Sequence, residues 1–104
     1  GCPALQCSTA SQGNTVSHYM LIHWDIEGNP TALGSYQAKG RALALDLAAS
    51  RCFELDDHQR ISVSDGRSSW RGMVGQLFRL GVLDMPWSQA RATESALLQM
   101  HWGL

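Results

Sequence analysis

Residues 17–27, SHYMLIHWDIE, decide the fold because apolar side chains recur at every second position. One face of this alternation is entirely apolar and consists of Met20, Ile22, Trp24 and Ile26. The opposite face is mixed and consists of Tyr19, Leu21, His23, Asp25 and Glu27. A period of two places successive side chains on opposite faces of a β-strand. The segment therefore predicts a strand with one face buried and the other in contact with solvent.

The next segment predicts a turn, a second strand and a helix. The run Gly28-Asn29-Pro30 contains residues that favour tight turns, and residues 31–36 can then return beside the first strand. Residues 37–51 are dense in alanine and leucine at helical spacing. Because alanine is the best helix former and a poor strand former, this run predicts the central helix of the domain.

Two shorter strands are predicted after the helix. Residues 60–64, RISVS, alternate clearly and place Ile61 and Val63 on the inner face. Residues 53–55, FEL, alternate over a shorter distance. The polar residues at 56–59 lie between the two segments and predict the turn that joins them.

Two signals compete between residues 65 and 80. The pair Asp65-Gly66 directly after a strand is a strong hairpin signal and would make residues 67–71 a further strand. In contrast, Ser69 is a good helix N-cap, and an apolar stripe at helical spacing runs to Leu80 and stops at a glycine. We predict a helix from about residue 69 to residue 80 and keep the hairpin as the alternative.

The predicted order of elements places the chain in the α+β class. A third helix is predicted from about Pro86 onward, because proline suits the first turn of a helix and apolar residues follow it. These elements pack most simply as a small antiparallel sheet of three to four strands, with one central helix and two C-terminal helices on one face. Residues 17–104 then form a single domain. Residues 1–16 carry no charge and no periodicity, and they predict a flexible N-terminal arm.

Charge is scarce in this chain. Charged residues make up 16% of it, against about 25% in an average domain, and it holds four tryptophans. A charge-poor surface with aromatic side chains is typical of protein–protein interfaces. We therefore expect a non-catalytic interaction module that pairs with itself as a homodimer. The side chains that we assign to this interface are Tyr19, Leu21, Trp87 and Trp102.

The distribution of charge favours a second hypothesis, nucleic-acid binding. Residues 1–59 carry three basic and six acidic residues, whereas residues 60–104 carry five arginines and three acidic residues. The two predicted C-terminal helices, residues 69–102, resemble a helix-turn-helix pair because a glycine separates them. We favour the other interpretation of these helices, a plain pair of antiparallel amphipathic helices, and keep the helix-turn-helix as the alternative. The arginines that would contact phosphates are Arg67, Arg71, Arg79 and Arg91.

The sequence holds no catalytic, cofactor or metal-binding signature. Its serines, histidines and carboxylates do not form a nucleophile elbow or another catalytic pattern. His23 and Asp25 share a strand face, and Asp56-Asp57-His58 form a polar cluster, but no H-x-H or H-x-x-x-H pair exists. We therefore predict no catalytic residue, no cofactor and no metal. A small-molecule-binding domain or an enzyme, with a pocket between sheet and helices, is the third hypothesis.

Cysteine usage and hydropathy predict a cytoplasmic location. Cys2, Cys7 and Cys52 are odd in number and lack C-x-x-C spacing, so a disulfide scaffold is not expected. Cys52 follows the alanine- and leucine-rich run and predicts a small buried core residue in a reducing compartment. No apolar run approaches the roughly 18 residues that would cross a membrane, so we expect no membrane partner.

Overall fold

The computed structural model describes residues 16–80 and 86–102, without the side chains of residues 79, 80 and 102. In this range five antiparallel strands form one sheet in the order β2-β1-β3-β4-β5. The strands are β1 (Ser17–Trp24), β2 (Pro30–Ala38), β3 (Arg60–Ser64), β4 (Ser68–Met73) and β5 (Ser88–Gln89). The helices are α2 (Arg41–Arg51), α3 (Val74–Leu80) and α4 (Ala92–Trp102). The α+β class with a small antiparallel sheet is confirmed, and the predicted arm, residues 1–16, lies outside the described range except for its last residue.

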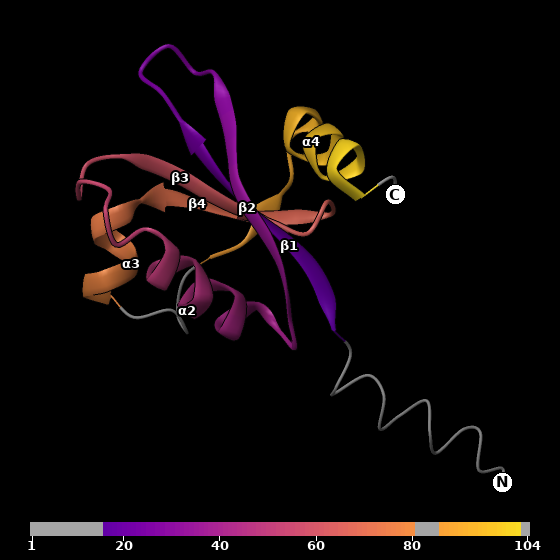
Figure 1. Ribbon diagram of the computed structural model, residues 1–104, viewed down its shortest axis with the longest axis horizontal. Coiled ribbons are helices and arrows are strands. Elements are labelled where there is room, and N and C mark those ends of the chain that lie inside the picture. The colour runs from indigo at the N-terminus through magenta and orange to yellow at the C-terminus, as the bar shows by residue number, and fades with distance from the viewer. Residues whose placement is uncertain (1–15, 81–85, 103–104) are drawn as a thin grey trace, which may run out of the picture.

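Strand β1 has helices on both of its faces. Tyr19 and Leu21 belong to the core beneath α2 and are 3% and 0% exposed. Met20 and Ile22 pack on the other face with a leucine of α4 and are 1% and 0% exposed. Figure 1 shows α2 and α3 on one side of the sheet and α4 on the other. The prediction of a half-buried strand with all helices on one face is therefore wrong, because both alternating sets of side chains are apolar here and each set needs a cover.

The side of the sheet beneath α2 and α3 holds the larger core. Tyr36 of β2 donates its hydroxyl hydrogen bond to the carbonyl of Ala44 at 2.7 Å, and burial raises the pKa of its phenol. Trp70 of β4 is 3% exposed in the same core. Cys52, at the end of α2, is fully buried, and this burial raises the pKa of its thiol to about 11. The prediction that Cys52 is a small buried core residue is confirmed.

The first hairpin and the central helix agree with the predictions apart from their boundaries. Asp25 Oδ1 accepts the backbone N–H groups of Glu27 and Asn29 at 2.9 Å and 2.8 Å, and Gly28 adopts a φ of +87°. The hydrogen bond from Asn29 is the main reason why the pKa of the Asp25 carboxyl lies below its usual value. Strand β2 continues to Ala38, so α2 begins four residues later than the alanine-rich run suggested.

The segment after β3 is a hairpin and not the start of a helix. Asp65 Oδ1 accepts the N–H groups of Arg67 and Ser68 at 2.8 Å and 2.9 Å, and Gly66 adopts a φ of +91°. A glycine with positive φ at the first central position is typical of the type II′ turn, whose twist suits antiparallel strands. Residues 69–73 of β4 then pair with all five residues of β3. The predicted helix is therefore wrong over residues 69–73, because the ladder to β3 outweighs the local helical stripe.

Residues 53–55 form part of a turn after α2 instead of the predicted strand. Phe53 is 84% exposed, so its side chain does not contribute to the core. Two apolar residues without a neighbouring strand to pair with gain too little to hold an extended conformation. The strand count is nevertheless higher than predicted, because β4 and β5 both join the sheet on the far side of β3.

Candidate functional site

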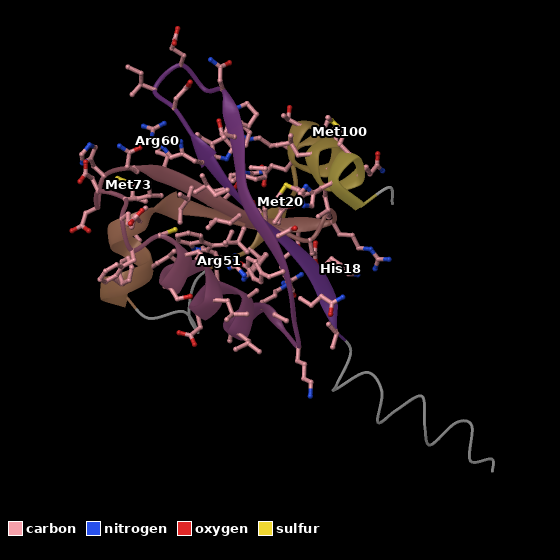
Figure 2. All side chains as sticks on the ribbon, viewed as in Figure 1. His18, Met20, Arg51, Arg60, Met73 and Met100 are labelled. Carbon is pink, nitrogen blue, oxygen red and sulfur yellow. The ribbon has the colours of Figure 1, made fainter. Side chains whose placement is uncertain are left out.

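A cleft of about 480 Å³ opens at the end of the sheet where β1 ends and β3 begins. Trp24 is the last residue of β1 and lies opposite Arg60, the first residue of β3. Arg60 also lies opposite Met73 of β4, and Figure 2 shows these two side chains at the same end of the sheet. The β1–β2 turn, Gln76 of α3 and Arg91 complete the wall. This volume falls within the range of small-ligand sites.

The ring of Trp24 is held in place at the cleft. Its indole N–H donates to Ser62 Oγ at 2.9 Å, and its ring packs against the small core beneath α4. Its side chain is only partly buried, so part of the ring faces the cleft. The guanidinium of Arg91 lies 5.5 Å from the ring centroid, which is within the range of a cation–π contact. An oriented aromatic surface and a cation therefore meet in this cleft.

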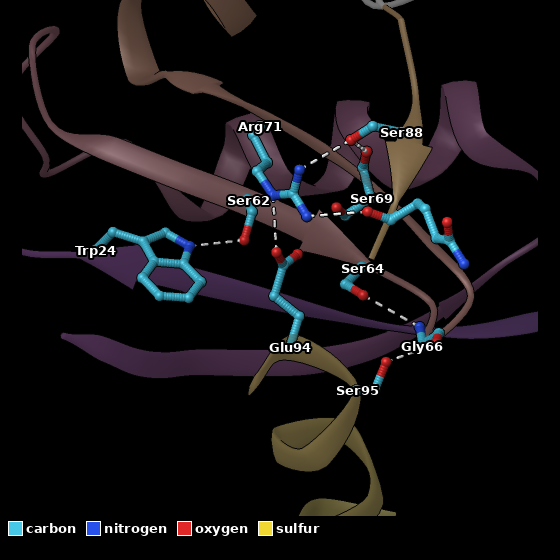
Figure 3. A network of polar contacts seen from close by, with 10 residues as sticks. Trp24, Ser62, Ser64, Gly66, Ser69, Arg71, Ser88, Glu94 and Ser95 are labelled. Carbon is cyan, nitrogen blue, oxygen red and sulfur yellow. Dashed lines mark hydrogen bonds and ion pairs between the residues drawn. The ribbon is translucent and has the colours of Figure 1, made fainter. Parts of the chain in front are cut away.

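Arg71 joins β4 to β5 and α4 through all three nitrogens of its guanidinium (Figure 3). Nε donates to Glu94 Oε1 at 2.8 Å, Nη1 donates to Ser88 Oγ at 3.0 Å, and Nη2 donates to the carbonyl of Gln89 at 3.0 Å. The Glu94 side chain is fully buried, whereas 28% of the Arg71 side chain is exposed. Because a buried charge needs a partner, this pair fixes the start of α4 against the sheet. Arg71 is therefore a positioning residue for Arg91, which directly precedes α4.

The cleft has more arginines than carboxylates, and two of these arginines have no carboxylate partner within the described part of the chain. Three arginines and two carboxylates line it, so the lining is positive on balance. Asp25 already accepts two backbone hydrogen bonds inside its own turn, and Glu27 lies exposed at the rim. Arg60 and Arg91 are exposed and have no carboxylate partner within the described part of the chain, where the single salt bridge is that of Arg71. The cleft can therefore accept an anion without first breaking an ion pair.

The structure brings together two of the four arginines that the sequence suggested for nucleic-acid contacts. Arg71 and Arg91 line the cleft, whereas Arg67 lines a second hollow beside α4. The side chain of Arg79 lies outside the described residues. Arg60 was not among the predicted site residues. In the sequence it is recognisable only as the first residue of a strand. Its neighbour Trp24 is far away in the chain, and only the β1–β3 pairing reveals their contact.

Helices α3 and α4 form neither the helix-turn-helix pair considered for residues 69–102 nor the plain antiparallel pair. Val74 and Leu77 of α3 belong to the core that contains α2, whereas Leu98 of α4 packs on the opposite face of the sheet. The physical reason is that β5 lies between the two helices in the chain and pairs with the edge of β4, which leads the chain across to the other face. This geometry corrects the prediction and offers no recognition helix of that kind.

Two of the four predicted interface residues, Tyr19 and Leu21, lie in the core and not on the surface. Tyr19 and Leu21 are 3% and 0% exposed, because α2 covers their face of the sheet. Trp87 is partly buried against Tyr19, at 6.2 Å between ring centroids, and its ring carries the guanidinium of Arg41 at 4.9 Å. The side chain of Trp102 lies outside the described residues. Tyr19 and Leu21 are therefore corrected from interface residues to core residues.

Residues 16–80 and 86–102 contain neither a cluster of metal ligands nor a membrane-spanning helix. In this range no three His, Cys, Asp or Glu side chains lie together in a way that would hold a metal ion. His23 instead contacts Gln59 Oε1 through its Nε2. Nor does any helix in these two ranges have the length and apolar content to span a membrane.

The cleft thus combines an oriented aromatic ring, two exposed arginines and room for a small ligand. These properties depend on residues of this chain alone. Comparison with protein-family models, with curated proteins and with solved structures finds no match to it.

Proposed function

We propose that the protein is a non-catalytic binding module that holds an anionic ligand in the cleft beside Trp24. The observation that carries this proposal is the convergence of Arg60 and Arg91, two exposed side chains from different elements, on one cleft of about 480 Å³. Guanidinium groups bind phosphate or carboxylate through two parallel hydrogen bonds. The residues that line the cleft can bind and orient the ligand, and we propose no chemical reaction at this site.

Inorganic pyrophosphate is the probe that tests this proposal. At ten times its dissociation constant, a ligand that binds only the folded state adds about 1.4 kcal/mol to the free energy of unfolding. For a domain of this size the thermal midpoint should then rise by roughly 6–11 °C. The increase should disappear in the double variant R60M/R91M, as measured by thermal unfolding at constant ionic strength.

The variant R67M is the matched control, because Arg67 is an exposed arginine that lines a different hollow. It should keep the full pyrophosphate response. An equal loss of response in R67M would indicate general charge attraction and would contradict a specific site, as would an undiminished response in R60M/R91M.

Self-association through β2 is a second candidate function. Strand β2 forms one edge of the sheet, and its nine residues, PTALGSYQA, carry no charge. Natural edge strands are usually protected by charged residues or bulges. Leu21 and Ile22 pair with Gly34 and Ala32, so Leu33 of β2 is the extra residue of a bulge, and the longest regular part of the edge is residues 34–38. A second copy could add its own β2 there in antiparallel orientation.

Sedimentation equilibrium between 1 and 100 μM tests this second candidate, and a dimer is the expected result. The variant Q37K places a charge on the regular part of the edge and should shift the protein to monomer. The variant T31K, beyond the bulge, is the matched control and should remain dimeric. A monomer at every concentration would contradict the candidate without affecting the anion site.

A further inference from the structure

We infer that the ligand of the cleft is a nucleotide unit, either free or within a single-stranded nucleic acid, whose base stacks on Trp24 and whose phosphate contacts Arg60 and Arg91. This inference rests on the proposed function and names the chemistry of its ligand. A simple anion would use the two arginines but would have no need of the ring. A nucleotide would use both parts of the site, because its base can stack on the ring and its phosphate can contact the two arginines.

The ring of Trp24 is suited to receive a base. The hydrogen bond from its indole N–H to Ser62 Oγ, 2.9 Å long, fixes the ring plane against the sheet. The guanidinium of Arg91 lies over the ring at 5.5 Å from its centroid. A planar base can take the place of this guanidinium on the indole, and Arg91 can in turn stack on the base or turn to its phosphate. Aromatic side chains that present such a face bind single-stranded nucleic acids with little dependence on sequence.

Arg60 is placed to hold the phosphate. It lies directly opposite Trp24 in the β1–β3 ladder, so both side chains project from the same face of the sheet. Arg60 is exposed, and no carboxylate engages it in the described part of the chain. Arg71, in contrast, already directs its three nitrogens to Glu94, Ser88 and Gln89. Two arginines that line the cleft with Trp24 are therefore available for phosphate.

The dimensions of the site favour an unpaired base over a duplex. The cleft has a volume of about 480 Å³, and Trp24 is partly buried within it. A base in a duplex is stacked on both faces and cannot reach a recessed ring unless it is flipped out, which costs stacking and pairing energy. A base in a single strand or in a free nucleotide is not restricted in this way.

Fluorescence anisotropy with labelled ten-nucleotide strands, (dT)10 and (rU)10, tests the inference on the full chain. We expect binding to both strands and at least tenfold weaker binding to a ten-base-pair duplex. Unlabelled thymidine monophosphate should compete for the site. If the monophosphate competes as strongly as the strand, the ligand is a free nucleotide, and if it is at least tenfold weaker, the ligand is a single strand. Because both arginines contact one phosphate, the logarithm of the association constant should fall with the logarithm of salt concentration with a slope of about −0.7.

Variants at the ring separate stacking from charge. W24L should weaken binding of the strand about tenfold or more, whereas W24F, which keeps a ring, should retain most of it. If W24L folds poorly, W24M takes its place, because methionine also removes the ring and keeps a long apolar side chain. R67M is the matched control outside the cleft and should bind like the unmodified protein. Pyrophosphate binding should be the same in W24L as in the unmodified protein, because the ring takes no part in it.

These readouts distinguish failure of the inference from failure of the proposed function. The nucleotide inference would be overturned, and the anion site would stand, if pyrophosphate binding needs Arg60 and Arg91 but nucleotide binding is unchanged in W24L. Equal affinity for duplex and single strand would overturn it as well. If the unmodified protein binds neither pyrophosphate nor a nucleotide, both the nucleotide inference and the proposed anion site are overturned.

Discussion

Replacing Arg71 by methionine is expected to lower the free energy of unfolding by about 3–5 kcal/mol, the usual cost of removing one partner from a buried ion pair. The reason is that Glu94 is fully buried and its only charged partner among the described residues is Arg71, at 2.8 Å. The same substitution removes the hydrogen bonds to Ser88 and Gln89, which hold β5 and the start of α4. Urea unfolding followed by circular dichroism at pH 7 measures the change.

A double variant separates the ion pair from the packing around it. In R71M/E94L the buried carboxylate is also removed, and apolar replacement of a whole buried pair is often nearly neutral. We therefore expect the double variant to be more stable than R71M. R67M, at an exposed arginine that is not the salt-bridge partner of Glu94, should change the stability by less than about 0.5 kcal/mol. A double variant that is less stable than R71M would contradict the assigned role of the pair.

Replacing Gly66 by alanine should lower the free energy of unfolding by about 2–5 kcal/mol, the sum of a backbone penalty and an overpacking penalty. Gly66 has a φ of +91°, which L side chains rarely adopt. In addition, a Cβ at this position would lie 2.7 Å from Leu98 Cδ2, and Leu98 is 2% exposed and has little room to move. The turn also receives the hydrogen bond of Ser95 Oγ to its backbone carbonyl, at 2.8 Å, so the strain would reach α4.

Gly28 provides the matched control for this second prediction. Its φ is +87°, and a Cβ built on it has no atom within 4 Å. G28A should therefore show only the backbone penalty, about 1–2 kcal/mol. Thermal or urea unfolding of the two variants side by side isolates the contact with Leu98. Equal losses in G28A and G66A would show that α4 does not press on the β3–β4 turn.

Both predictions concern the attachment of α4, and this attachment also matters for the candidate site. Arg91 directly precedes α4, and its guanidinium reaches the ring of Trp24 only while the helix is held against the sheet. The buried Arg71–Glu94 pair holds the start of the helix, and the packing of Leu98 holds its middle. Variants that loosen α4 should therefore weaken ligand binding even though they do not touch the ligand.

Among the elements, those with a strong local pattern were predictable. Strand β3 and the core part of β1 follow from alternation, and α2 follows from its alanine and leucine content. The turn at Gly28 and the burial of Cys52 follow from residue chemistry in the same way. At residues 65–73 both local signals were present in the sequence, and the weighting between them was wrong. The Asp65-Gly66 turn prevailed because β3 was beside it to pair with, which no local pattern reports.

The sequence by itself determined the class of the fold and the identity of most strands and helices, because these depend on neighbours within a few residues. Only the tertiary structure decided which face each helix covers, and so it turned Tyr19 and Leu21 from surface candidates into core residues. It also decided the site, since Trp24, Arg60 and Arg91 come from three separate segments. These three residues come together through long-range strand pairing and one buried ion pair. Neither interaction produces a periodic pattern in the sequence.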